Sequence, residues 1–169
     1  MADFDINQIA STLDSEDMIG FTRSFVEDIR KGLNAVNIDR YPWIEEISSG
    51  QWQGVLALGM GGSAAGGDFL SSICDLKGSI PVVVQRDYVI PAWWDDQWLV
   101  IATSHSGNTE EAIEATEIAL KSGATVIVIS TGGILSGLAE LHYNCYLIPS
   151  IGGQPPRSAF GHIFARQLA

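Results

Sequence analysis

Residues 55–68 read VLALGMGGSAAGGD, a short apolar run that leads through a turn dense in glycine into the start of a helix. Four more apolar runs follow along the chain, at residues 81–85, 98–103, 125–130 and 145–148. They are nearly continuous and do not alternate with polar residues, which is typical of strands buried on both faces. Helical patterns separate the runs, and alternating strands and helices predict crossover connections and a parallel sheet.

The predicted fold class is therefore α/β, a three-layer α/β/α sandwich with a five-stranded parallel sheet of the flavodoxin or Rossmann kind. A helix precedes it, because six apolar residues recur at steps of three and four between residues 18 and 36. We expect this helix to open at Ser15 and the first residues of the chain to be irregular. Residues 1–50 are predicted to form a helical lead-in that packs on a domain made by residues 51–169.

The composition narrows the class of protein and its compartment. Hydrophobic residues make up 46% of the 169 residues and charged residues 17%, the opposite of the balance in a disordered chain. The sequence holds no stretch of 18 apolar residues, so no membrane span is predicted. Its first ten residues lack Lys and Arg and match neither a signal peptide nor a transit peptide. We expect a cytoplasmic protein without a membrane partner.

Charge and cysteine content exclude further kinds of site. A net charge of −11 argues against nucleic acid as a partner, since binding to phosphates along a strand needs a basic face. Cys74 and Cys145 belong to no CxxC motif or Cys/His cluster, so we expect two reduced thiols and no metal site. Five tryptophans would either anchor a subunit interface or cover the edges of the core.

Two loops at strand ends carry the residues that an anion site needs. Five of the ten residues 59–68 are glycine, which lets the backbone approach a ligand, and Ser63 stands among them. Residues 104–109, SHSGNT, place three hydroxyls at the start of the next helix. A phosphate group would be held there by hydroxyls and by the N–H groups of residues 106–109. The plain alternatives are a tight strand–helix turn in the first loop and helix N-capping in the second.

A dinucleotide site is another alternative for the first loop. Gly59, Gly61 and Ala64 fit the loose pattern GxGxx[GA]. Asp87 is a late match for the acidic residue that such a site needs after its second strand. A nicotinamide-binding domain has no obvious use for the second, hydroxyl-rich loop.

The two loops together resemble a known family. Gly61-Gly62-Ser63 after one strand and Ser104-x-Ser106-Gly107-Asn108-Thr109 after another resemble the sugar isomerase (SIS) domain. Three sequence stretches are similar to the N-terminal half of the bifunctional phosphoglucose/phosphomannose isomerases. They are GMGGS with a later GD, then SxSGNTEE, then PRSAF at residues 156–160.

This resemblance implies an SIS-type fold, a substrate and a reaction. The residues that it implies in substrate binding are Ser104, Ser106, Gly107, Asn108 and Thr109 around the phosphate group and Gly61, Gly62 and Ser63 on the sugar side. Arg157 would face the active site. The implied reaction converts glucose 6-phosphate or mannose 6-phosphate to and from fructose 6-phosphate by enediol proton transfer. It would be carried out by a homodimer without metal or cofactor.

Departures from the family bear on catalysis. His105 stands where the family often has tyrosine. The glutamate base of those enzymes lies in a later half, so we expect residues 51–169 to be an SIS domain truncated before a second one and to lack that base. A non-catalytic sugar-phosphate-sensing module is the alternative.

Few residues of this chain are candidates for proton transfer. Arg157 and His105 are the catalytic candidates. Glu110 and Glu111 stand in a first helical turn, where they complement the helix dipole. His162 is expected on a helix surface or facing a partner subunit.

Overall fold

A five-stranded, all-parallel sheet forms the centre of the fold in the computed structural model, which describes residues 5–169. The strand order is β2-β1-β3-β4-β5. The strands are β1 (Val55–Leu58), β2 (Val82–Gln85), β3 (Leu99–Ser104), β4 (Val126–Ser130) and β5 (Cys145–Pro149). The helices are α1 (Ile6–Leu13), α2 (Met18–Ala35), α3 (Trp43–Ser48), α4 (Gly61–Lys77), α5 (Glu110–Lys121), α6 (Gly133–Leu141) and α7 (Phe160–Leu168).

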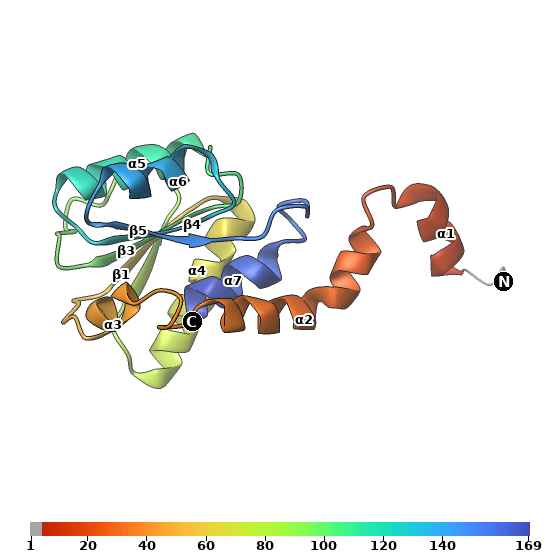
Figure 1. The fold of residues 1–169 in the computed structure, drawn as a ribbon, viewed down its shortest axis with the longest axis horizontal. Coiled ribbons are helices and arrows are strands. Elements are labelled where there is room, and N and C mark those ends of the chain that lie inside the picture. Colours follow the sequence, from red (N-terminus) through yellow and green to blue (C-terminus); the bar gives the residue numbers. More distant parts are fainter. Residues whose placement is uncertain (1–4) are drawn as a thin grey trace.

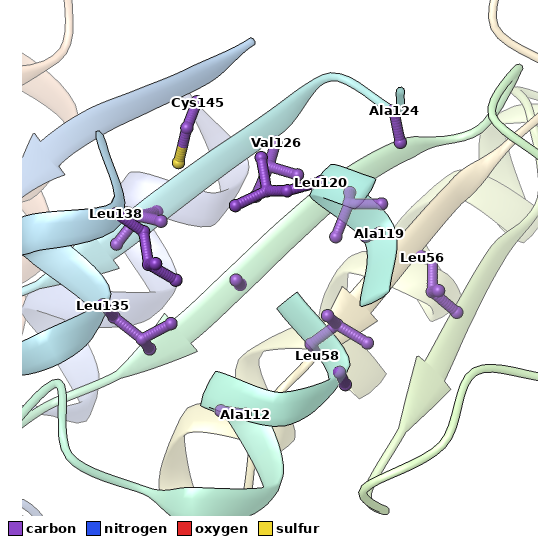
Figure 2. Close-up of a cluster of buried hydrophobic side chains, with 14 residues drawn as sticks. Leu56, Leu58, Ala112, Ala119, Leu120, Ala124, Val126, Leu135, Leu138 and Cys145 are labelled. Carbon is purple, nitrogen blue, oxygen red and sulfur yellow. The ribbon is translucent and has the colours of Figure 1, made fainter. Parts of the chain in front are cut away.

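Helices cover both faces of the sheet and make three layers (Figure 1). Helices α5 and α6 lie on one face, and α3, α4 and α7 lie on the other. Alternate residues of β1 serve the two faces: Leu56 and Leu58 join the core under α5 and α6 (Figure 2), whereas Val55 and Ala57 join the opposite core. The predicted α/β/α sandwich is confirmed.

The N-terminal region differs from the prediction in two places. Helix α1 lies between the first half-dozen residues, which were expected to be irregular, and Ser15, and it was not predicted; residues 1–4 lie outside the described part of the chain. Helix α2 begins at Met18 and not at Ser15. The Asp14 carboxylate accepts two backbone N–H groups at the start of α2, at 2.7 and 2.8 Å, so Asp14 supplies the cap that we expected from Ser15.

Helix α2 packs on α7 with its second half, while α1 and the start of α2 extend away from the sheet (Figure 1). Gly32 permits the close approach of α2 to α7, because a Cβ added to Gly32 would lie 2.5 Å from the Ala165 Cβ. Phe25 of α2 stacks on Phe160 of α7, with ring centroids 6.2 Å apart. The predicted lead-in therefore contacts the rest of the fold. The division at residue 50 stays a prediction.

The strand order creates a topological switch point between β1 and β3. From β1 the chain passes to β2 on one side, and from β3 it passes to β4 on the other side. Ligands of open parallel sheets bind at such a point, beyond the carboxyl ends of the strands. The loops that follow β1 and β3 are the two loops singled out in the sequence, so the fold brings them together.

Candidate functional site

A cavity of about 350 Å³ lies at the switch point, between the two loops. Seven of the ten predicted site residues line it, and Met60 and Pro156 complete the lining. The seven are Gly61, Gly62, Ser63, His105, Ser106, Thr109 and Arg157. The cavity therefore unites the glycine loop (residues 59–68) with the hydroxyl turn (residues 104–109) and adds Arg157 from the segment before α7.

Ser104 holds the hydroxyl turn together from inside. Its side chain is buried, with 1% of the residue exposed, and its Oγ lies 2.8 Å from Thr109 Oγ1. The same Oγ accepts the Gly107 N–H at 3.1 Å. Ser104 does not line the cavity, so a direct contact between Ser104 and a phosphate group stays a prediction.

Gly107 and Asn108 join the hydroxyl turn to the start of α6. Gly107 has φ +71°, and a Cβ built on it would lie 1.8 Å from the Gly132 carbonyl oxygen, so only glycine fits there. The Asn108 Oδ1 accepts the Ile134 N–H at 3.1 Å, which turns this side chain toward α6. Both residues shape the site without lining the cavity.

The helices that start at the cavity lack side-chain caps. Met60 and Thr109 occupy the N-cap positions of α4 and α5, and neither side chain caps its helix. The Thr109 hydroxyl pairs with Ser104 instead, so the alternative of N-capping is wrong for Thr109. The first N–H groups of both helices and their positive dipole ends are left for a ligand at the cavity.

Of the charged residues discussed so far, Arg157 lines the cavity, whereas Glu110 and Glu111 do not. Arg157 lines the cavity with an exposed guanidinium, whose Nη2 lies 3.7 Å from Glu16 Oε2. No Asp or Glu among residues 5–169 belongs to the lining. Glu110 and Glu111 lie outside it, and Glu111 is the main cause that raises the pKa of Tyr88.

His105 lies between the hydroxyl turn and the segment that leads to Arg157. Its Nε2 lies 3.1 Å from the Gln154 carbonyl oxygen, and because a carbonyl only accepts, Nε2 carries the proton. Its Nδ1 is buried without a partner among the described residues. Its own carbonyl oxygen accepts the Thr131 hydroxyl at 2.7 Å. The sequence did not predict the contacts of Gln154 and Thr131 with His105, because nothing in the local pattern indicates them.

His162 differs from the prediction of a helix-surface or subunit-facing residue. It is 2% exposed, and its Nε2 lies 3.3 Å from Asp28 Oδ1 on α2. Burial is the main cause that lowers the pKa of His162, while Asp28 acts in the opposite direction.

Among residues 5–169, no three His, Cys, Asp or Glu side chains gather as a metal ion would need. Within the same residues, no helix combines the length and the apolar character required to cross a membrane.

Comparisons with known proteins identify relatives by sequence. No family model matches the chain. It is 48% identical over 111 residues to the bifunctional phosphoglucose/phosphomannose isomerase of Caldicellulosiruptor bescii, covering 65% of this chain and 32% of that protein. It is 39% identical over 125 residues to the enzyme of the same name from Thermoplasma volcanium, covering 74% of this chain and 38% of that protein. The chain thus spans about a third of the length of these relatives.

Solved structures share the fold at lower identity. One is tagatose-6-phosphate ketose/aldose isomerase from Escherichia coli, with a TM-score of 0.62 and 21% identity over 85% of this chain and 46% of that chain. Another is the Vibrio vulnificus NanR protein complexed with ManNAc-6P, with a TM-score of 0.63 and 19% identity over 95% of this chain and 62% of that chain. This chain is a sequence relative of the bifunctional phosphoglucose/phosphomannose isomerases, and its fold is of the SIS type.

Proposed function

We propose that this chain binds a hexose 6-phosphate in the switch-point cavity, as the phosphosugar-binding part of an aldose–ketose isomerase. The proposed reaction interconverts glucose 6-phosphate or mannose 6-phosphate with fructose 6-phosphate. The observation that carries the proposal is the meeting of the glycine loop, the hydroxyl turn and Arg157 at one cavity. The names of the relatives supply the class of substrate.

The chemistry of the lining suits a phosphate monoester. Ser106 and Thr109, which carry hydroxyls, line the cavity, and the uncapped starts of α4 and α5 supply N–H donors. Arg157 adds a guanidinium, which can hold two phosphate oxygens at once. The sugar would extend toward Gly61, Gly62 and Ser63, where two positions without a side chain leave room for it.

Isomerisation through an enediol needs a base at the C1 and C2 protons and an acid for ring opening. His105 is the imidazole of the lining that can donate or accept a proton, and Arg157 can stabilise the negative charge of an enediolate. No described Asp or Glu lines the cavity, which supports our proposal that this chain lacks the carboxylate base by itself.

A non-catalytic sugar-phosphate sensor is the second candidate, and the same lack of a carboxylate in the described lining favours it. Incubation of the purified chain with glucose 6-phosphate and mannose 6-phosphate tests the sensor. Formation of fructose 6-phosphate by the chain alone would exclude the sensor.

We further propose that the protein acts in the cytoplasm as a homodimer. Trp93 is 56% exposed and lies against Trp98 in a tilted arrangement, with ring centroids 5.0 Å apart, which suits a subunit contact. The other tryptophans are partly buried, as residues that cover the core are. Analytical ultracentrifugation at high micromolar concentration tests the dimer, and a pure monomer contradicts it.

Isothermal titration with fructose 6-phosphate tests the binding site. Replacing Ser106 with Ala and Thr109 with Val should lower the affinity at least about tenfold, since two hydrogen bonds to a charged group are lost. Ser122→Ala is the matched control, because its hydroxyl bonds Ile118 O at the far end of α5. Equal affinity of the double variant and the wild type would remove the phosphate assignment.

A further inference from the structure

Buried and partly buried polar side chains link the hydroxyl turn to helix α2. His105 Nε2 contacts the Gln154 carbonyl oxygen, and the Gln154 side-chain Nε2 lies 3.4 Å from Asp28 Oδ2. Asp28 also meets Ser24 Oγ at 3.0 Å and His162 Nε2 at 3.3 Å. A continuous line of contacts therefore runs from the cavity wall, through the segment before α7, to the N-terminal helix.

Stability alone is a poor explanation for this line of contacts. Asp28 is 3% exposed, and removing a carboxylate from water costs free energy that neutral partners repay only in part. Three further atoms along the line, His105 Nδ1, Gln154 Oε1 and His162 Nδ1, are buried without partners among the described residues. Apolar side chains would fill the same space at lower cost, so the polar groups call for a role in the site.

The geometry indicates that role. Gln154 lies three residues before Arg157, in a segment whose neighbours Gly152 and Gly153 are exposed. The Gln154 side chain fastens this exposed segment to α2, and its carbonyl fixes which nitrogen of His105 carries the proton. Arg157 and His105 line the cavity, whereas Gln154 does not. A movement of Gln154 would nevertheless shift both Arg157 and the His105 ring.

We propose that Asp28 and Gln154 are positioning residues for the sugar-phosphate cavity, acting through His105 and the segment that carries Arg157. This inference rests on the proposed function. Helix α2 is then part of the binding machinery, although it does not line the cavity. Its Asp28 carboxylate sets the position of the cavity wall.

The test compares Gln154→Met with the wild type. Methionine keeps the length of the side chain and removes the amide that reaches Asp28. Gln53→Met is the matched control, because the Gln53 amide bonds Gln97 Oε1 at 2.7 Å on an exposed part of the surface. Fructose 6-phosphate affinity, measured by titration calorimetry, should fall about threefold to tenfold in Gln154→Met, the equivalent of one hydrogen bond, and stay unchanged in Gln53→Met.

A spectroscopic readout separates positioning from general loosening of the fold. The imidazole ¹⁵N shifts of His105, assigned by their loss in His105→Gln, should show the Nε2–H form in the wild type. In Gln154→Met and in Asp28→Asn they should move toward a mixture of the two tautomers. His142, at the end of α6, serves as the internal reference whose shifts should not change.

The outcomes distinguish this inference from the proposed function. Unchanged affinity and unchanged His105 shifts in Gln154→Met, with a wild type that binds fructose 6-phosphate, overturn the positioning role. A wild type that binds no fructose 6-phosphate overturns the proposed function instead. In that case the His105 shifts alone decide whether Gln154 positions the ring, and constant shifts reject it.

Discussion

Replacing Gly107 with Ala should damage both the stability of the fold and the binding of phosphosugar. Gly107 has φ +71°, a region that costs a residue with a Cβ about 1–2 kcal/mol. The new Cβ would lie 1.8 Å from the Gly132 carbonyl oxygen and 2.7 Å from Ser130 Oγ. Because the nearest atom is backbone, it cannot swing aside, and the turn must shift at a further cost of about 1–3 kcal/mol. The expected loss is about 2–5 kcal/mol in the free energy of unfolding.

Urea unfolding followed by tryptophan fluorescence measures the loss, and Gly137→Ala is the matched control. Gly137 lies inside α6 with nothing within 4 Å of an added Cβ, so alanine should stabilise the helix there by about 0.5–1 kcal/mol. Calorimetry with fructose 6-phosphate measures the second effect, because the shifted turn carries Ser106. A Gly107→Ala protein with the stability and the affinity of the wild type would refute this account of the turn.

Three further predictions concern the core and two titratable groups. Leu135→Ala, at a position on α6 with 0% exposure, should lower the free energy of unfolding by about 2–5 kcal/mol in urea titrations. Burial lowers the pKa of His162 below 6.5, so the unfolded chain takes up the proton first. Stability should therefore fall as the pH drops below 6.5, and less steeply in His162→Gln. Burial raises the pKa of Cys145 to about 12, so one thiol should react with Ellman's reagent at pH 8 in the folded chain and two in urea.

The central sheet was predictable because its strands are buried on both faces. Runs such as residues 55–58 and 126–129 are apolar throughout, and such a run has few other ways to fold next to helices. The start of α2 was not predictable from composition. Asp14 and Ser15 are both good capping residues, and in the structure the Asp14 carboxylate accepts the N–H groups at the start of α2.

The sequence predicted which loops form the candidate site better than it predicted the contacts of their individual side chains. Three hydroxyls in six residues suggested equal roles, but Ser104 ends strand β3 and is buried, whereas Ser106 lies at the cavity. No local pattern could pair His162 with Asp28, because the two residues lie 134 positions apart and meet only when α7 packs on α2. Long-range pairs of this kind depend on helix packing, which the sequence of either helix alone does not fix.

The acidity of the chain leads to a last prediction, on ionic strength. With a net charge of −11, the protein repels a phosphate dianion at long range. The cavity attracts it at short range through N–H groups, hydroxyls and one arginine. Salt screens the repulsion beyond about 10 Å at 0.1 M and affects the short contacts far less. Fructose 6-phosphate affinity should therefore stay constant or rise when NaCl is raised from low concentration to about 0.1 M. A steep fall would mean that cationic side chains, and not the starts of α4 and α5, dominate binding.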